Sequence, residues 1–340
     1  MFRTVKVEDA VGMAIAHDLT KIVPSEFKGA AFKKGHIIRL EDVQKLKDMG
    51  KYHIYVLELG KGILHENEAV QRIVDCTVGK GLDYSQPSEG KITLKSKYEG
   101  IIRINLDALY AINSIEDIMF ATIHENSLIK KGSKVAGTRI IPLTISEEKI
   151  NEVEKICKEK GPVIYAEQFL PKKGGIIITG SEVYDGRITD KFGPVMEKKF
   201  EALNIVNIGV EYSKDDAEMT AQKIEKLINA GAEIIICAGG MSVDPDDLTP
   251  AAIKSISDKV ITYGAPILPG AMFMLAYKGE VAIMGVPACA MYHKATALEL
   301  VLPRVLVGEK LNKMDIVKMA NGGFCLGCDE CTYPLCPFGK

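Results

Sequence analysis

Tryptophan is absent from this chain, and aromatic residues make up only 6% of it. A shortage of stacking side chains argues against a platform for single-stranded nucleic acid. The formal net charge is −2, and the lysines and arginines are scattered along the chain instead of forming a basic stripe. Nucleic-acid binding depends on such a stripe, so we expect no nucleic-acid partner.

The chain also lacks a long apolar run. Its longest, Val281–Met291, is interrupted by Pro287 and is far shorter than the ~20 residues that a membrane span requires. Residues 1–20 contain neither the apolar core nor the small-residue cleavage site of a signal peptide. We therefore expect a cytoplasmic protein with no membrane partner, and reduced thiols in that compartment.

Several common nucleotide and nucleophile motifs are missing. The sequence contains no G-x-x-x-x-G-K-[ST] phosphate loop and no G-x-G-x-x-G that opens a helix. It also contains no nucleophile elbow of the serine-hydrolase type. These absences exclude the phosphate-loop, dinucleotide-binding and serine-hydrolase classes.

The length of 340 residues suggests two or three domains. A helix is expected at Glu41–Met49, closed by Gly50, with a strand at Tyr52–Leu59, and a charged amphipathic helix at Glu147–Lys160, ended by Gly161–Pro162. The expected divisions are a small α+β unit at 1–60, a β-rich domain at 61–145, a helix and linker at 146–171, an α/β domain at 172–308 and a cysteine-rich tail at 309–340.

Strands and helices alternate strictly in the α/β domain, which predicts a parallel sheet with helices on both faces. A hairpin is expected from Met272–Tyr277 and Glu280–Met284, joined by Lys278–Gly279. The other expected strands are Ile176–Thr179, Ile205–Val210, Glu233–Cys237 and Val260–Tyr263. The expected helices are Phe192–Leu203, Asp215–Ala230 with Ser213 as its cap, Pro250–Ser257 and Met291–Val305.

Two of these buried strands run into loops rich in glycine, serine and aspartate. The first loop contains Gly180, Ser181, Asp185 and Asp190, and the second contains Gly239, Gly240, Ser242, Asp244, Asp246 and Asp247. Backbone N–H groups of such loops bind phosphate, and carboxylates bind Mg²⁺ that bridges to phosphate. Either loop alone is also what an ordinary turn looks like. Together, at successive strand ends, they predict a site for a phosphorylated small molecule.

Four segments of this region occur in a family-specific order: TGSEVYDGRITDKFGP, ICAGGMSVDPDDLTP, LPGAMFMLAY and MGVPACAMYHKA. Their order and spacing resemble the motifs of the molybdopterin-binding (molybdenum cofactor biosynthesis) domain family over about residues 172–308. The resemblance implies an αβα sandwich with a mostly parallel sheet. It also implies binding of molybdopterin or its adenylylated form, Mg²⁺-dependent insertion of molybdate, a homo-oligomer, and molybdoenzymes as clients.

Matching the motifs position by position assigns roles to residues of this chain. The resemblance implies that Asp247 and Asp190 are catalytic, with Asp247 as the Mg²⁺ ligand. The residues that it implies for cofactor binding are Thr179, Gly180, Ser181, Glu182, Asp185, Gly239, Gly240, Met241, Ser242, Pro269 and Gly270.

The chain also departs from the family pattern. The Lys-Pro that follows Pro-Gly in the third motif is Ala271–Met272 here, which removes a positive charge, and the fourth motif carries Cys289 where the family has Asn. Three functions therefore remain open: an enzyme that inserts molybdate, a non-catalytic module that binds or delivers the cofactor, and a nucleotide-hydrolysing protein similar to the competence-damage-inducible family.

The tail concentrates four of the chain's eight cysteines as C-x2-C-x2-C-x4-C-P, formed by Cys325, Cys328, Cys331 and Cys336. Four thiolates so close in sequence are typical of one metal centre, which predicts an iron–sulfur centre or zinc, with free or redox-active thiols as the alternative. Two His-Glu-Asn strings, at His65 and His124, are candidate ligands or, alternatively, turn residues at strand ends.

Overall fold

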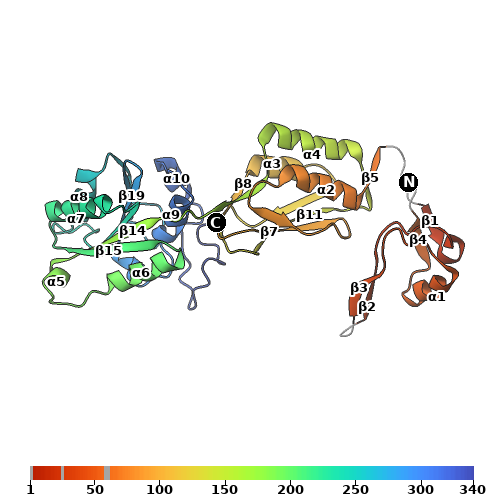
Figure 1. Ribbon diagram of the computed structural model, residues 1–340, viewed down its shortest axis with the longest axis horizontal. Coiled ribbons are helices and arrows are strands. Elements are labelled where there is room, and N and C mark those ends of the chain that lie inside the picture. Colours follow the sequence, from red (N-terminus) through yellow and green to blue (C-terminus); the bar gives the residue numbers. More distant parts are fainter. Residues whose placement is uncertain (1–2, 24–26, 57–61) are drawn as a thin grey trace. The chain divides into compact units, whose positions relative to one another are not determined.

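The computed structural model describes residues 3–23, 27–56 and 62–340, and the chain forms two compact units. The first unit comprises residues 1–98, 102–123 and 129–166, and the second comprises 99–101, 124–128 and 167–340. We describe each unit by itself (Figure 1). Among the described residues, no helix has the length and apolarity needed to cross a membrane.

The N-terminal part of the first unit is a small α+β assembly. Its elements are β1 (Arg3–Lys6), the 3-10 helix η1 (Val7–Ala10), β2 (Leu19–Val23), β3 (Phe27–Phe32), α1 (Leu40–Asp48) and β4 (His53–Val56). Strands β1 and β4 pair in antiparallel fashion, and β2 and β3 form a hairpin. Helix α1 confirms the helix expected at Glu41–Met49. Strand β4 lies within the expected strand Tyr52–Leu59, whose end falls outside the described residues.

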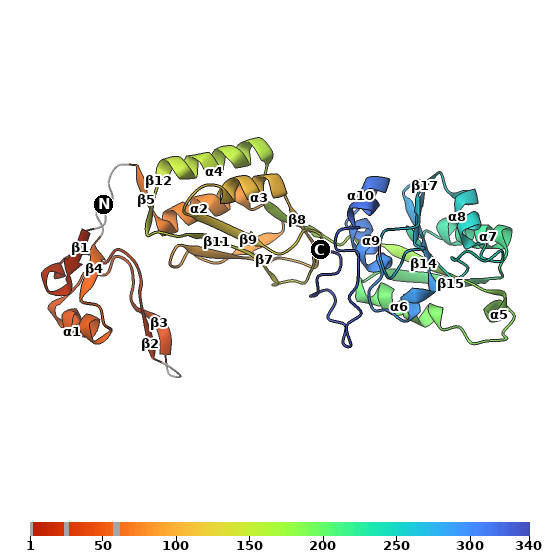
Figure 2. The same ribbon diagram turned by 180° about the vertical axis from the view of Figure 1, so that it is seen from behind.

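The rest of the first unit packs two helices on one face of a sheet and a third helix against those two (Figure 2). The helices are α2 (Glu66–Thr77), α3 (Leu106–Asn113) and α4 (Glu147–Lys160). The strands are β5 (Ile63–His65), β6 (Leu82–Tyr84), β7 (Lys91–Ser96), β8 (Gly100–Ile104), β9 (Ile118–Thr122), β10 (Leu128–Ile129), β11 (Lys134–Ile140), β12 (Thr144–Ser146) and β13 (Ile164–Gln168). The main sheet has the order β6-β7-β11-β9.

The sequence prediction for this region is correct for α4 and wrong for α2 and α3, which it places in β structure. Both missed helices begin at capping side chains: His65 accepts from the N–H of Asn67, and Asn105 accepts from that of Ala108. In α2 the buried residues recur at helical spacing, and they face α4 and the sheet. The pattern is therefore present in the sequence, hidden among the many short strands around it.

The second unit is built on a six-stranded sheet of order β15-β14-β16-β19-β18-β17. The strands are β14 (Lys173–Thr179), β15 (Val206–Ser213), β16 (Ile234–Ala238), β17 (Lys259–Tyr263), β18 (Met274–Lys278) and β19 (Val281–Val286). Strands β15, β14, β16 and β19 are mutually parallel, whereas β18 is antiparallel to both β19 and β17. The mostly parallel sheet and the expected hairpin are confirmed.

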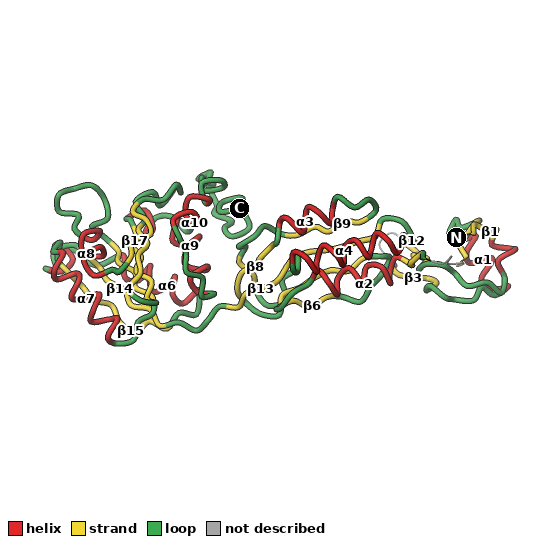
Figure 3. The backbone as a smooth tube through the Cα atoms, turned by 90° about the horizontal axis from the view of Figure 1, so that it is seen from above, coloured by secondary structure: helices red, strands yellow, loops and turns green. Residues whose placement is uncertain are grey.

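Helices cover both faces of this sheet (Figure 3). They are α5 (Ser181–Tyr184), α6 (Phe192–Ala202), α7 (Ala217–Asn229), α8 (Thr249–Ile256), the 3-10 helix η2 (Ala288–Met291), α9 (Ala297–Leu306) and α10 (Lys313–Lys318). Ile176 and Ile178 of β14 pack with α6 and α9, while Ile177, which points the other way, packs with α7 and α8. Successive residues of the strand thus pack into two separate cores, one on each face of the sheet. The αβα sandwich is confirmed.

Two helix starts differ from the sequence prediction. Asp216, not Ser213, caps α7, because its carboxylate accepts from the N–H of Met219 at 2.7 Å while Ser213 ends β15 and hydrogen-bonds Thr220. Helix α9 begins at Ala297 and not at Met291, because Thr296 and Glu299 form a capping box there.

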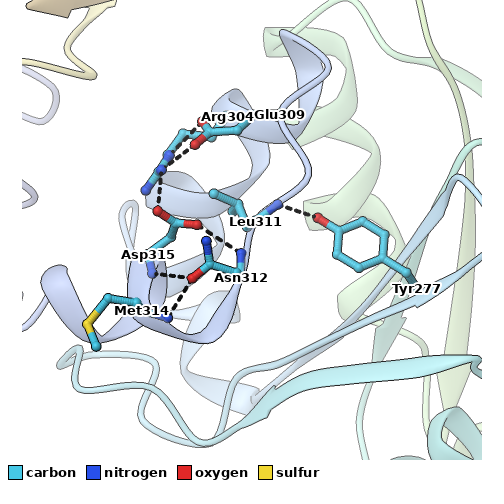
Figure 4. A network of polar contacts seen from close by, with 7 residues as sticks. All are labelled: Tyr277, Arg304, Glu309, Leu311, Asn312, Met314 and Asp315. Carbon is cyan, nitrogen blue, oxygen red and sulfur yellow. Dashed lines mark hydrogen bonds and ion pairs between the residues drawn. The ribbon is translucent and has the colours of Figure 1, made fainter.

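A polar network joins the end of α9 to α10, a helix that sequence reasoning missed (Figure 4). Arg304 is only 9% exposed, and its Nε donates to Oε2 of Glu309 at 2.8 Å while its guanidinium lies 3.4 Å from Asp315. Asn312 caps α10 by accepting from the N–H groups of Met314 and Asp315. The network fixes the start of the chain segment that leads into the tail.

Candidate functional site

The four motif segments meet at one edge of the six-stranded sheet. Strands β14, β16 and β19 are parallel, so their carboxyl ends lie at the same edge, and the antiparallel pairing of β18 brings the end of β17 there as well. The first loop follows Thr179, the second follows Ala238, the third joins β17 to β18, and the fourth follows Val286. An open α/β sheet places its ligands at this kind of edge.

The first and second loops are joined through two threonine hydroxyls. The Oγ1 atoms of Thr179 and Thr249 lie 3.0 Å apart, and that of Thr249 donates to the carbonyl of Gly239 at 2.9 Å. Gly239 has a φ of +102°, and a Cβ placed on it would lie 2.3 Å from the carbonyl oxygen of Thr179. The second loop therefore passes so close to the end of β14 that no side chain fits between them.

The first loop is tied to the end of β15 by reciprocal bonds. The N–H of Ser181 donates to Oδ2 of Asp215 at 2.8 Å, and the N–H of Asp215 donates to Oγ of Ser181 at 3.2 Å. Sequence reasoning did not select Asp215. It lies two residues after the end of β15, which is parallel to β14, so its position at the same sheet edge was the signal that could have found it. Glu182 is exposed, and its carboxylate lies against Gly180.

Asp190 has a capping role at the start of α6. Its Oδ1 accepts from the N–H groups of Phe192 and Gly193 at 2.8 and 3.0 Å, and its Oδ2 accepts from the hydroxyl of Tyr212 at 3.1 Å. Burial, followed by this bond to Asp190, raises the pKa of Tyr212. Asp185, which is exposed, pairs instead with Lys214 at 3.1 Å.

A cavity of about 560 Å³ opens beside the first loop. Its walls are mainly apolar and aromatic, with Asp190 and Glu197 as acidic members. The residues that give it this character are Val183, Tyr184, Ile188, Val210 and Tyr212. Its volume lies within the range of roughly 300–1,000 Å³ that small-molecule sites usually have.

The second loop contributes one half-buried carboxylate and little else from its side chains. Oδ2 of Asp247 accepts from the N–H of Asp244 at 3.3 Å. The hydroxyl of Tyr263 donates to the carbonyls of Met241 and Ser242, both at 3.1 Å. Burial and then the charge of Asp247 raise the pKa of Tyr263. Met241 is only 3% exposed and belongs to the core, so only its backbone faces the loop, whereas Ser242 is exposed.

The third and fourth motifs pack against the start of α9. Gly270 is buried, and a Cβ on it would lie 2.7 Å from the N atom of Ala297, while Pro269 beside it is half-buried. Cys289 is half-buried on η2, and burial raises the pKa of its thiol. Close by, Lys199 of α6 pairs with Glu299 of α9 at 2.5 Å. That lysine already has a partner, so it does not replace the charge missing at Ala271–Met272.

The predicted metal ligands are not gathered. In residues 3–23, 27–56 and 62–340, no three His, Cys, Asp or Glu side chains lie together as a group that could hold a metal ion. The four tail cysteines are free thiols: Cys328 and Cys331 are exposed, and Cys325 and Cys336 are half-buried.

The two His-Glu-Asn strings behave as structural residues. The Nε2 atom of His65 lies 2.7 Å from the carbonyl of Ala16, and its Nδ1 accepts from the N–H of Asn67, so both ring nitrogens are engaged. His124 is exposed in a turn after β9. Neither arrangement is that of a metal ligand.

Glu66, next to His65, supports a prediction on pH. It is 3% exposed, and this burial is the main cause that raises its pKa from 4.5 to about 7. The negative charges of Glu89 and Asp18 raise the pKa as well, whereas the positive charges of Arg139 and Lys34 lower it. The folded protein keeps this proton up to about pH 7, whereas the unfolded chain loses it near 4.5. Stability should therefore fall by about 2–3 kcal/mol as the pH rises through this window.

Urea unfolding between pH 5 and 8.5 tests this expectation. In a Glu66→Gln variant the pH-dependent loss should shrink by about 2–3 kcal/mol, since glutamine does not titrate. Glu68→Gln, a change at an exposed neighbour on the same helix, serves as the control and should keep the wild-type pH profile. An unchanged profile in Glu66→Gln would contradict the assignment.

The comparisons with known proteins agree with this geometry. Residues 175–306 match the family described as probable molybdopterin binding domain, and residues 4–58 match a domain of unknown function. The site at the strand ends lies wholly within the first of these ranges. The second unit of this chain thus carries a domain of the molybdopterin-binding type, and residues 175–306 belong to that domain family.

Two curated relatives match this chain over different lengths. A molybdopterin molybdenumtransferase of Staphylococcus epidermidis is 22% identical over 293 residues, which span 80% of this chain and 63% of that protein. A CinA-like protein of a Mycobacterium species is 30% identical over 81 residues, 24% of this chain and 19% of that protein. The chain thus spans about a fifth of the length of the CinA-like relative.

Two solved structures are similar to parts of the chain. The tungsten cofactor synthesizing protein MoaB of Pyrococcus furiosus is 20% identical with a TM-score of 0.34, over 40% of this chain and 92% of that one. The molybdopterin biosynthesis protein MoeA of Pyrococcus horikosii is 13% identical with a TM-score of 0.35, over 72% of this chain and 79% of that one.

Proposed function

We propose that the second unit binds molybdopterin, or its adenylylated form, at the strand-end edge described above. The protein would then act in the synthesis, maturation or delivery of the molybdenum or tungsten cofactor. The observation that carries the proposal is the meeting of all four motif segments at the carboxyl ends of β14, β16, β17 and β19, within the segment that belongs to the molybdopterin-binding family.

The loops offer a place for the phosphate of the ligand. Gly239 and Gly240 are successive residues with positive φ, a conformation whose backbone N–H groups can bind an anion, whereas the N–H of Gly180 donates to the carbonyl of Ser213 at 3.1 Å. The hydroxyl of Thr179 and the N–H of Ser181 lie at the same strand end, where Asp215 fixes the loop. The apolar and aromatic cavity beside the first loop is suited to the planar pterin ring.

Asp247 is the residue that fits Mg²⁺ best. Proteins usually hold Mg²⁺ with one or two carboxylates, completed by substrate phosphates and water. Asp247 is half-buried, and its hydrogen bond from Asp244 is long, so it keeps oxygen lone pairs for an ion. Both oxygens of Asp190 are engaged by α6 and Tyr212. We therefore assign the Mg²⁺ ligand to Asp247 and a positioning role to Asp190.

A nucleotide ligand is the second candidate. The segment of 81 residues that is 30% identical to a CinA-like protein favours it. The resemblance to the competence-damage-inducible family, noted from the sequence motifs, is what implies a nucleotide-related ligand. The same glycine loops and the same carboxylate would serve a dinucleotide phosphate. The two functions therefore differ in the ring that occupies the cavity, and a binding experiment separates them.

The test is ligand analysis of protein purified without oxygen. Wild-type protein should carry or take up molybdopterin, detected as pterin fluorescence after oxidative release. The Asp247→Ala variant should bind it about 10- to 100-fold more weakly when Mg²⁺ is present, since a contact with a charged group contributes roughly 1.5–3 kcal/mol. The Asp246→Ala variant, changed at the exposed neighbour, should bind like the wild type.

Absence of pterin, even after incubation with molybdopterin, would overturn the proposal. Tighter binding of a dinucleotide would favour the second candidate. If pterin binds, molybdate-dependent turnover separates an inserting enzyme from a binding or delivery module. Sizing of the same sample tests the expected homo-oligomer, and pull-down with molybdoenzymes tests the expected clients.

A further inference from the structure

The tail forms a closed loop of chain that contains all four clustered cysteines. The N–H of Gly339 donates to the carbonyl of Gly322 at 2.9 Å, so the two ends of the segment 322–339 meet. Both glycines have positive φ, and a Cβ on Gly322 would lie 2.2 Å from the carbonyl oxygen of Lys340. The closure therefore depends on glycine at its base.

The base of this loop is held firmly on the second unit. The N–H of Cys325 donates to the carbonyl of Leu268, and the N–H of Leu268 donates to that of Gly323, both at 2.8 Å. Phe338 is 3% exposed within the core, and its ring lies beside that of Tyr333, whose hydroxyl donates to the carbonyl of Glu299 at 3.0 Å. Cys325 and Cys336 pack against the same core.

The middle of the loop makes few hydrogen bonds. Among the described residues, the backbone groups of 326–331 form no hydrogen bonds with other backbone groups. The carbonyl of Cys331 accepts from Nζ of Lys294 at 3.5 Å. Cys328 and Cys331 are both exposed on this stretch, which carries neither helix nor strand. A segment without a core of its own needs another source of order, and four thiols are the groups that it offers.

We propose that Cys325, Cys328, Cys331 and Cys336 bind one thiolate-ligated metal centre. Two ligands, Cys325 and Cys336, come from the anchored base of the loop. The other two, Cys328 and Cys331, lie on the stretch without backbone hydrogen bonds. The four thiols do not lie together in the structure, so this stretch would move toward the base when the metal binds. Each thiol loses a proton to solvent when it binds, and no oxidant or reductant is consumed. Thiolates select soft centres, so the occupant is Zn²⁺ or an iron–sulfur cluster.

This centre would lie beside the third motif, because Leu268, which pairs with the tail, directly precedes Pro269 and Gly270. The inference does not depend on the pterin proposal. A protein that binds no pterin could still bind metal at the tail, and the two experiments have different readouts.

The experiment uses the full chain, purified without oxygen. Metal content, acid-labile sulfide and absorbance near 400 nm of the isolated protein distinguish zinc from an iron–sulfur cluster. Metal-free protein is then titrated with Zn²⁺ against a chromophoric chelator. The wild type should bind one equivalent, and the Cys328→Ser/Cys331→Ser double variant should bind it more than about 100-fold more weakly, since even outer-shell changes lower metal affinity by roughly 10- to 100-fold.

Controls separate this site from general thiol effects and from misfolding. Cys76→Ser and Cys289→Ser, at thiols outside the tail, should bind like the wild type. Because Cys328 and Cys331 are exposed, the double variant should match the metal-free wild type in thermal unfolding. The proposal is overturned if the wild type contains no more zinc or iron than the double variant. It is also overturned if the metal is lost when the cysteines outside the tail are replaced.

Discussion

A Gly239→Ala variant will bind molybdopterin at least about 30-fold more weakly than the wild type, which corresponds to about 2 kcal/mol. The new methyl group would lie 2.3 Å from the carbonyl oxygen of Thr179 and 2.8 Å from its Oγ1. At a φ of +102° the alanine is strained as well. The second loop must therefore move away from the end of β14, which separates the two halves of the phosphate site. Equilibrium titration with molybdopterin, monitored by pterin fluorescence, measures the loss.

Gly231 provides the matched control. It has a φ of +96° just after α7, and nothing lies within 4 Å of the position that a Cβ would take there. Gly231→Ala should therefore lower the free energy of unfolding by about 1–2 kcal/mol through backbone strain alone, with pterin affinity unchanged. Equal affinity losses in the two variants would show that the effect at Gly239 is a general loss of stability and not a displaced loop.

An Arg304→Ala variant will unfold with a free energy about 2–4 kcal/mol lower than that of the wild type. Arg304 is 9% exposed and lies between Glu309 and Asp315, as Figure 4 shows. Removing it takes away the guanidinium that pairs with both carboxylates, and the segment that positions α10 loses its contact with α9. Urea unfolding at neutral pH measures the change. The expected loss of unfolding free energy is smaller than for a fully buried ion pair, because the two carboxylates are about a quarter exposed to solvent.

Two controls isolate the charge. Arg304→Met retains most of the side-chain volume, so any loss of stability that it shares with Arg304→Ala comes from the lost ion pairs of the guanidinium. Lys310→Ala removes an exposed cation that pairs with Glu280 at 2.9 Å, and it should cost less than about 1 kcal/mol. A loss at Lys310 as large as that at Arg304 would contradict the reason given for the effect.

The α/β unit was predictable because its signals are local and repeated. Buried strands of β-branched residues alternate with capped amphipathic helices, and the period of each element is visible in the sequence. Boundaries were less predictable. Asp216, not the expected Ser213, caps α7, because β15 continues as far as Ser213 and leaves the helix to begin at Ala217. Helices α2 and α3 were missed because strand-like sequences surround them.

The candidate site was predictable in position and less so in the roles of its side chains. Gly239 and Gly240 lie where the motif requires a close approach of backbone. Asp190 was selected as a catalytic residue and Met241 as a cofactor contact, and in the structure the Asp190 carboxylate accepts from the first N–H groups of α6 while the Met241 side chain lies in the core. Asp215 and Tyr263, which hold the first and second loops, come from other strand ends and were not selected. A sequence shows which loops gather, whereas hydrogen-bond partners follow from packing.

The burial of β14, β16 and β19 on both faces has a consequence for sequence divergence in this domain. These strands obtain their stability from two cores on either side of the sheet, and the loops at the strand-end edge add buried side chains such as Met241 and Phe273 alongside exposed ones. Residues such as Ala271 and Ser242, which are exposed in those loops, are therefore free to drift without weakening the fold. A change at Ala271 should therefore alter ligand affinity more than it alters the free energy of unfolding.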